Sequence, residues 1–272
     1  MSIAWSLLSK SFPEPEMVAI LEMLRNRRKR KDVYSSPEFW DGKAGHYSDS
    51  AISMFTNRRY NALIEIDQFA FIDSVLGNIS GAHVLDVGAG TGRLSRHLAR
   101  QGANVGSFDF AAAVVEIARR LNGALPIEAK VMSVFDLDEV EAFDHAAVLG
   151  CLSAACKDRG DLETAAERLY KAVRPGARVA IIEPFHQGHL HRVLDMPLND
   201  VLDVFRAAGF AVTHRAELHF WPVRLFLAPV EWPGFITRAL YHVGEAILRI
   251  APARQQWGDY KGIGLVRQDA PR

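Results

Sequence analysis

A glycine-rich turn between a buried strand and a helix limits most strongly what this chain can fold into. Residues 83–94 read HVLDVGAGTGRL, so an apolar strand over 83–87 leads into Gly88, Gly90 and Gly92 and then into a helix over 91–101. Glycines let the main chain turn tightly and approach a ligand closely. A helix N-terminus offers free N–H groups and the positive end of the helix dipole. The turn therefore predicts a ligand site where a strand of a sheet ends.

Strands and helices alternate on both sides of this turn. Short apolar stretches predict strands over 83–87, 104–108, 127–131, 143–149, 178–182, 210–214 and 261–267. Stretches of helical periodicity predict helices over 57–78, 91–101, 111–121, 162–173 and 201–208. Because the alternation implies crossover connections, the expected fold is α/β, a doubly wound and mostly parallel sheet with helices on both faces.

The composition excludes several classes of protein. Hydrophobic residues make up 49% and charged residues 24%, which is typical of a folded globular chain. With 32 basic and 32 acidic residues, no net charge draws the chain toward nucleic acid or anionic lipid. Two cysteines, Cys151 and Cys156, predict no disulfide framework, no four-cysteine zinc site and a reducing compartment. The first residues lack the basic stretch that is typical of secretory signals, so we expect a cytoplasmic protein. The two cysteines match no metal-ligand spacing, so we expect no bound metal.

Two acidic residues limit which ligands the turn can bind. Asp109 ends the second strand, where a carboxylate can accept both hydrogen bonds of a ribose diol, and it can also cap the next helix. The dinucleotide fingerprint requires a third glycine, but Arg93 occupies that position. Asp86 places a carboxylate beside the turn, which repels a diphosphate and attracts an ammonium group. These residues favour adenosine joined to a zwitterionic amino acid.

With these residues in place, the chain resembles the class I S-adenosylmethionine-dependent methyltransferases. VLDVGAGTGRLSRHLA (84–99) is similar to their first motif and NVGSFD (104–109) to their second. VFDL (134–137), FDHAAVLGCL (143–152) and LYKAVRPGARVAIIEP (169–184) follow in the family's order. The resemblance covers about residues 81–215. It implies an enzyme with a Rossmann-like sheet of seven strands whose last strand is antiparallel, and S-adenosylmethionine as the cofactor.

The resemblance also implies a set of cofactor-binding residues. Matching the motifs position by position assigns to the cofactor Asp86, Gly88, Ala89, Gly90, Gly92, Asp109, Phe110, Phe135, Asp136, Leu137, Leu149, Gly150 and Tyr47. The glycine turn would hold the methionine part, Asp109 the ribose, and Leu149 and Gly150 would border the methyl group. Alternatives stay open for three residues: Phe110 as a core aromatic, Asp136 as a turn residue and Tyr47 as a surface aromatic.

The sequence departs from the family pattern after the fourth strand. Many family members have a histidine there, whereas this chain has Ser153 and Ala154, so the resemblance implies no catalytic residue at that place. After the fifth strand, His186 is a candidate general base because imidazole titrates near neutral pH. A polar surface loop is the alternative interpretation of His186.

Two segments lie outside the matched core. We expect an N-terminal helical extension and cofactor lid over 1–56, a methyltransferase core over 57–217, an inserted cap over 218–260, and a last strand and tail over 261–272. The basic stretch 25–31 is either a solvated helix end or a patch for phosphate, anionic lipid or an acidic partner. In the insertion, an apolar stripe of helical spacing comprises Ile236, Leu240, Val243, Ile247 and Ile250. Packing on the sheet domain, covering an apolar substrate and lying on a membrane surface all explain this stripe.

The predicted function is methyl transfer to an oxygen or nitrogen of a small, largely apolar acceptor, such as an aromatic, isoprenoid or secondary-metabolite intermediate. Methylation of a protein side chain or of RNA is one alternative, and cofactor binding without catalysis is another. The zero net charge and the lack of an RNA-binding module disfavour a nucleic-acid partner. Peripheral membrane contact stays open, and the sequence does not determine the oligomeric state.

Overall fold

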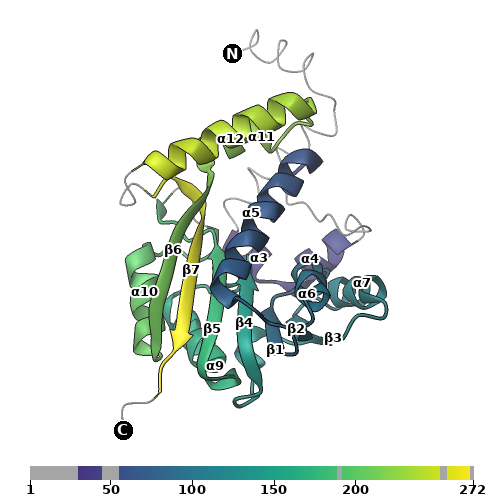
Figure 1. The fold of residues 1–272 in the computed structure, drawn as a ribbon, viewed down its shortest axis with the longest axis vertical. Coiled ribbons are helices and arrows are strands. Elements are labelled where there is room, and N and C mark those ends of the chain that lie inside the picture. Colours follow the sequence, from purple (N-terminus) through teal and green to yellow (C-terminus); the bar gives the residue numbers. More distant parts are fainter. Residues whose placement is uncertain (1–29, 45–54, 189–191, 252–255, 270–272) are drawn as a thin grey trace.

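The structure, a computed structural model, describes residues 30–44, 55–188, 192–251 and 256–269 (Figure 1). Its centre is a seven-stranded sheet in the order β3-β2-β1-β4-β5-β7-β6. The strands are β1 (His83–Val87), β2 (Asn104–Asp109), β3 (Ile127–Val131), β4 (Phe143–Leu149), β5 (Val173–Glu183), β6 (Phe210–Phe220) and β7 (Gly258–Arg267). β7 pairs antiparallel with β5 and β6, and the pairs among β1 to β5 are parallel. The predicted fold class is confirmed.

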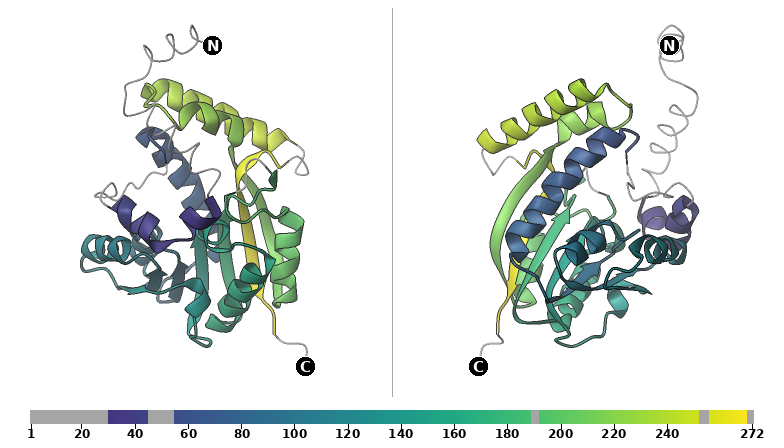
Figure 2. Two further views of the ribbon diagram at one scale, coloured as in Figure 1. Left: turned by 180° about the vertical axis from the view of Figure 1, so that it is seen from behind. Right: turned by 45° about the vertical axis from the view of Figure 1, so that its right-hand side comes forward.

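Helices cover both faces of the sheet (Figure 2). These helices include α5 (Arg58–Leu76), α6 (Arg93–Arg100), α7 (Ala112–Asn122), α9 (Arg159–Ala172) and α10 (Leu198–Ala207). Two apolar clusters result, one between the sheet and α5 with α6, the other between the sheet and α9 with α10. The carboxyl ends of β1, β2 and β4 are therefore left as the open edge between the layers, because helix packing covers the faces and not this end.

Three strands are longer than their sequence pattern predicts. β6 continues beyond residue 214 to Phe220, and β7 begins at Gly258, because the two pair along their whole length from Phe210 opposite Arg267 to Phe220 opposite Gly258. β5 begins at Val173 and includes Pro175 and Gly176, which the sequence predicts as a turn. Edge pairing of this kind depends on a neighbouring strand, so the local apolar pattern does not reveal it.

The insertion after β6 forms two helices, α11 (Trp221–Leu227) and α12 (Gly234–Ile250). α12 lies across the top of the sheet and of α5 in Figure 1. The predicted helix is confirmed, but its predicted apolar stripe is only partly packed. The buried residues are Thr237, Tyr241, Gly244 and Glu245. In the stripe, Ile236, Leu240 and Ile247 are half-buried, whereas Val243 and Ile250 are exposed.

Polar contacts explain this rotation of α12. The Tyr241 hydroxyl donates to Asp67 Oδ2 of α5 at 2.5 Å and lies 3.2 Å from His219 Nδ1. Glu245 Oε1 accepts from the Phe220 N–H at 3.3 Å. Burial raises the pKa of Glu245 to about 7 and lowers that of His219 to about 3. Because a buried polar group needs a partner, these contacts select the face that α12 turns inward.

Short helices precede α5. They are α3 (Arg30–Tyr34) and α4 (Pro37–Ala44), and α4 packs on α7 with Asp41 Oδ1 accepting from the Ala113 N–H at 2.8 Å. Tyr47 and most of the basic stretch 25–31 lie outside the described residues. Within the described part of the chain, no helix is both long and apolar enough to cross a membrane. The division into four parts stays a prediction.

Candidate active site

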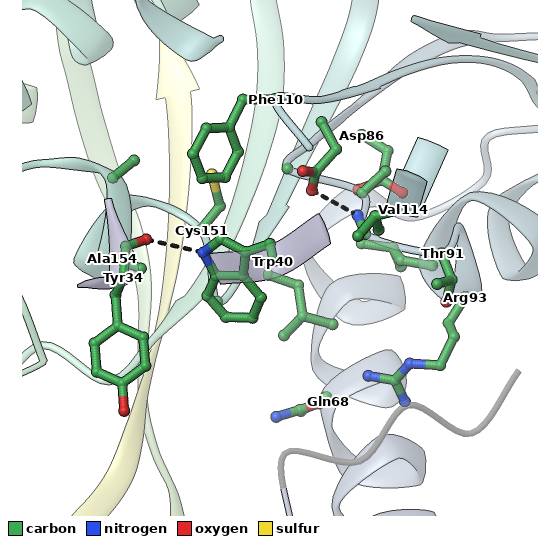
Figure 3. Close-up of a pocket in the computed structure, with 18 of the residues that line it drawn as sticks. Tyr34, Trp40, Gln68, Asp86, Thr91, Arg93, Phe110, Val114, Cys151 and Ala154 are labelled. Carbon is green, nitrogen blue, oxygen red and sulfur yellow. Dashed lines mark hydrogen bonds between the residues drawn. The ribbon is translucent and has the colours of Figure 1, made fainter. Parts of the chain in front are cut away.

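A cleft opens at the carboxyl ends of β1, β2 and β4, where the sequence predicts the ligand site. The turn after β1 forms one wall, and side chains from α4, α5 and the residues after β2 and β4 form the others (Figure 3). Eight of the residues that the sequence assigns to the cofactor line this cleft: Asp86, Gly88, Ala89, Gly90, Asp109, Phe110, Leu149 and Gly150. Residues far apart in the sequence thus meet at one edge of the sheet.

The glycines of the turn are required for different structural reasons. Gly88, Gly90 and Gly92 all have positive φ, at 66°, 56° and 77°. A Cβ on Gly88 would lie 2.4 Å from the Cβ and Sγ atoms of Cys151, so only glycine lets β1 and β4 end this close together. A Cβ on Gly90 would meet no atom within 4 Å, because it would lie in open space. Gly90 therefore leaves room for a ligand, and Gly88 leaves room for the protein.

This difference predicts unequal stabilities for two alanine variants. Gly90→Ala is expected to lose about 1–2 kcal/mol of unfolding free energy, because alanine is strained at positive φ. Gly88→Ala bears the same strain and must also displace Cys151, which adds about 1–3 kcal/mol. Urea unfolding of both variants measures the difference. A Gly88→Ala variant as stable as Gly90→Ala would contradict the close contact.

Gly92 does not line the cleft. It precedes α6, and a Cβ there would lie 2.9 Å from Asn122 Oδ1 and 3.2 Å from a guanidinium nitrogen of Arg96. The same Arg96 donates to the Thr91 carbonyl at 2.6 Å. Gly92 thus allows α6 and α7 to pack closely, and the structure does not bring it to the ligand side of the turn.

Asp86 is a buried carboxylate beneath the turn. It is 1% exposed, and its Oδ2 accepts a hydrogen bond from the Ser95 hydroxyl of α6 at 2.5 Å. Burial, with a smaller contribution from the nearby Asp109, raises the pKa of Asp86 to about 6. An ionised carboxylate in such a place favours a cation beside it. Because Asp86 lines the cleft, that cation would belong to a ligand.

Asp109 lies at the end of β2, on the other side of the turn. Its Oδ2 accepts from the Gly90 N–H and its Oδ1 from the Ala111 N–H, both at 3.0 Å. Burial raises the pKa of Asp109, while these N–H groups and that of Phe110 oppose the shift. Each carboxylate oxygen can accept a second hydrogen bond. Asp109 therefore orders the turn and the start of α7 while keeping acceptor capacity for a ligand diol.

A second hollow adjoins the cleft and shares Gly88, Asp109, Phe110 and Cys151 with it. Phe135 lines this hollow, in the short helix η1 (Val134–Asp136) that Ser133 caps. Asp136 and Leu137, which the sequence assigns to the cofactor together with Phe135, do not line this hollow.

Asp136 is exposed and lines neither hollow, and Leu137 is 1% exposed in the core beneath the sheet. Phe135, Asp136 and Leu137 therefore point in three different directions, so not all three residues of this motif can contact one ligand.

The end of β4 borders the cleft on its third side. Leu149 and Gly150 lie here, and the Gly150 N–H donates to the Ile182 carbonyl of β5 at 2.9 Å. The buried Glu183 accepts from the N–H groups of Cys151, Leu152 and Ser153, at 2.5, 2.8 and 3.1 Å. These bonds satisfy the start of α8 (Leu152–Ala155). Glu183 is thus a structural carboxylate that positions the main chain after β4.

An aromatic pair from the N-terminal segment lines the cleft from above. Trp40 of α4 donates its indole N–H to the Tyr34 carbonyl at 2.9 Å, and both residues line the cleft (Figure 3). The sequence predicts a lid in this region but points to Tyr47, which lies outside the described residues. The aromatic stretch that contains Trp40 was the available signal, and it does not distinguish one aromatic residue from another.

Further cleft residues come from α5 and β7, which the sequence analysis did not connect with the site. They are Asn61, Ile64 and Gln68 of α5 and Tyr260 of β7. Arg93 also lines the cleft and forms an ion pair with Glu65 of α5. No local motif marks these residues, because they reach the cleft only through the packing of α5 and the pairing of β7.

The candidate base His186 does not line the cleft. Its imidazole is buried, and its Nε2 lies 2.7 Å from the Asp259 main-chain carbonyl, to which it donates. Burial lowers the pKa of His186, and the nearby Lys261 ammonium lowers it further. The imidazole is therefore neutral near pH 7 and hydrogen-bonded inside the protein. The structure does not bring His186 together with the other predicted site residues.

Comparison with known proteins agrees with this architecture. Residues 84–176 match the family model described as a methyltransferase domain. The chain is 33% identical over 107 residues to a ubiquinone biosynthesis O-methyltransferase of Xylella fastidiosa, covering 38% of this chain and 42% of the relative. It is 31% identical over 141 residues to a demethylmenaquinone methyltransferase of Tropheryma whipplei, covering 44% and 53%. The chain thus spans about half the length of the curated relatives it matches, or less.

A solved structure shares the fold over most of the chain. The crystal structure described as a putative sarcosine dimethylglycine methyltransferase from Galdieria sulphuraria superposes with a TM-score of 0.59 at 15% identity, covering 86% of this chain and 98% of that one. The matched domain spans β1 to the first residues of β5, which carry the glycine turn, Asp109 and the end of β4. The methyltransferase domain over residues 84–176 and the strand order therefore support the class I, Rossmann-like S-adenosylmethionine-dependent methyltransferase fold that the sequence resembles.

Proposed function

We propose that this protein binds S-adenosylmethionine in the cleft and transfers its methyl group to an oxygen or nitrogen of a small, largely apolar acceptor. One observation carries the proposal: two carboxylates, the buried Asp86 and the half-buried Asp109, line one cleft on either side of a glycine turn that leaves open space at Gly90. A ligand that fits needs a diol and a cationic group linked through a short chain. S-adenosylmethionine has both.

The lining residues suggest how the cofactor is oriented. The ribose diol would lie at Asp109, and the ammonium group of the methionine part near Asp86. The adenine would enter the adjoining hollow, between Phe110 and Phe135, where aromatic side chains offer stacking area. This leaves the sulfonium end facing Leu149 and Gly150 at the end of β4.

The chemistry requires little of the protein beyond alignment. The bound sulfonium supplies a methyl group and leaves as a neutral thioether, so no acid is needed. Trp40, Tyr34 and Leu149 would keep water from the reacting centre, and the turn would hold the donor in line with the acceptor. A base is required only when the nucleophile carries a proton at neutral pH, and we assign that role to no residue.

The acceptor side of the cleft is apolar and aromatic. We assign this side to Phe55, Ile64 and Tyr260, which line the cleft and come from elements other than the glycine turn. The relatives named above include quinone methyltransferases, whose names agree with an apolar acceptor. Protein or RNA methylation stays an alternative without a specific observation in its favour, as does cofactor binding without catalysis.

Calorimetry tests the cofactor. S-adenosylmethionine and S-adenosylhomocysteine are expected to bind saturably, and NAD and NADP are not, because Arg93 occupies the position of the third dinucleotide glycine. Saturable NAD binding without a response to S-adenosylhomocysteine would overturn the proposal. Transfer of labelled methyl groups to a panel of phenols, hydroquinones and amines, with a peptide mixture and RNA as comparison acceptors, then tests the acceptor class. Labelling of peptide or RNA alone would contradict a small acceptor.

A further inference from the structure

Exposed apolar side chains gather on the insertion. Among the described residues, most of the exposed large apolar side chains lie between positions 225 and 257: Leu225, Phe226, Phe235, Val243, Ile250 and Trp257. Phe235 is 73% exposed and Ile250 is 84% exposed, although both belong to one well-formed helix. Single exposed apolar residues are ordinary, but a concentration on one element marks an interaction surface.

The helical geometry of α12 turns these residues into a continuous stripe. At 100° per residue, Phe235, Val243 and Ile250 lie within about 80° of one another, and the exposed Ala239 and Ala246 fall between them. The opposite side of the helix carries Thr237, Tyr241, Gly244 and Glu245, which are buried against the core. An apolar stripe of α12 therefore faces away from the protein.

Hydrogen bonds hold this orientation in place. Asn57 at the start of α5 donates to Thr237 Oγ1 at 3.3 Å, and the Tyr241 hydroxyl donates to Asp67 at 2.5 Å. Rotating α12 to bury its apolar stripe would expose the tyrosine ring and break these contacts. The stripe is thus presented outward by the fold itself.

The charges beside the stripe have one sign. Arg238, His242 and Arg249 are exposed and lie along one edge of it. Glu245, the acidic residue of α12, is buried on the inner face, and Glu231 before the helix pairs with Arg59 at 3.3 Å. An apolar face bordered by arginines is complementary to a layer of acyl chains beneath anionic head groups.

We propose that the outer face of α12 docks on the surface of an anionic lipid bilayer. The helix would lie in the interface, with Phe235, Val243 and Ile250 entering the acyl boundary and both arginines reaching phosphate groups. Tyr241 of α12 packs in one cluster with Ile64 of α5, and Ile64 also lines the cleft. Docking would therefore place the cleft one helix away from the lipid, within reach of acceptors dissolved in it. This proposal goes beyond the proposed function and does not depend on it.

Sedimentation with vesicles tests the proposal. The protein is expected to co-sediment with vesicles containing phosphatidylglycerol, and much less with pure phosphatidylcholine, in physiological salt. The double variant Phe235→Asp/Ile250→Asp is expected to lose at least tenfold in binding. Arg238→Gln/Arg249→Gln is expected to lose about fivefold for each arginine and most of the salt dependence.

The matched control is Val140→Asp. Val140 is 72% exposed in the loop at the amino end of β4, whereas α12 lies across the other end of the sheet (Figure 1), so this variant is expected to bind vesicles like the wild type. Calorimetry with S-adenosylhomocysteine and a melting curve confirm that the double variant is folded, and they separate loss of docking from loss of the cleft.

Three results would overturn the proposal. They are no binding to either vesicle, a double variant that binds like the wild type, and a wild-type dimer in sedimentation velocity that the double variant lacks while vesicles are ignored. The last result would assign the stripe to a second copy of the chain.

Discussion

Replacing Asp109 by alanine is expected to weaken S-adenosylhomocysteine binding about ten- to a hundredfold. The carboxylate is half-buried and accepts from the Gly90 and Ala111 N–H groups, so its loss removes the acceptors that we propose for the ribose diol and loosens the turn. Loss of a charged hydrogen-bond partner costs about 1.5–3 kcal/mol, which corresponds to this range of affinity. Isothermal titration calorimetry at neutral pH measures the change.

Asp136→Ala is the matched control for this experiment. Asp136 also follows a strand of the parallel sheet and was predicted to contact the cofactor, but its side chain is exposed and outside the cleft. The affinity of the Asp136→Ala variant for S-adenosylhomocysteine is expected to stay within about twofold of the wild type, a difference of about 0.4 kcal/mol. Asp109→Asn keeps one acceptor for the main chain and guards against a misfolded alanine variant. Equal affinities for the wild type and both Asp109 variants would remove this residue from the site.

Asp86→Asn is expected to separate stability from binding. Folding raises the pKa of Asp86 from 3.8 to about 6, so the native protein holds a proton in this interval that the unfolded chain releases. The wild type therefore loses stability, relative to the asparagine variant, as the pH rises from about 4 to 6. Across this interval the stability of the variant relative to the wild type is expected to increase by about 3 kcal/mol, because one pKa unit corresponds to 1.36 kcal/mol.

Cofactor binding is expected to change in the opposite direction. Without the carboxylate, the cationic methionine part of the cofactor loses its counter-charge, and affinity falls about ten- to a hundredfold. In the wild type, affinity is expected to fall as the pH drops below about 6, whereas the variant shows no such dependence on this group. Urea unfolding and calorimetry at pH 5 and pH 7.5 measure both effects. A stability difference that does not vary with pH would show that Asp86 ionises normally.

The sequence predicts the centre of the site well because that centre is built from local signals. A buried strand, glycines at alternate positions and an acidic residue at the next strand end each leave a mark within a few residues. Asp86, Gly88, Gly90 and Asp109 line the cleft as their motifs indicate. The alternation of strands and helices likewise predicts the doubly wound sheet, since each segment reveals its own periodicity.

The sequence does not predict the direction of a side chain where a motif gives only its approximate position in the fold. Phe135, Asp136 and Leu137 are consecutive, yet Phe135 lines the second hollow, Asp136 is exposed and Leu137 is buried in the core. His186 follows β5 as expected, but it donates to the Asp259 carbonyl inside the protein. Which way a side chain turns at the end of a strand depends on neighbours that are distant in the sequence.

The sequence alone predicted the family resemblance, the sheet and the half of the cleft that surrounds the glycine turn. The tertiary structure decided the other half, because Trp40, Gln68 and Tyr260 reach the cleft through the packing of α4 and α5 and the pairing of β7. It also decided which face of α12 is buried. An apolar stripe predicts burial only when nothing competes for the inner position, and here the hydrogen bond from Tyr241 to Asp67 favours the polar face inside. Hydrophobic periodicity shows which face of a helix is more apolar, but polar partners that are distant in the sequence help to determine which face is buried.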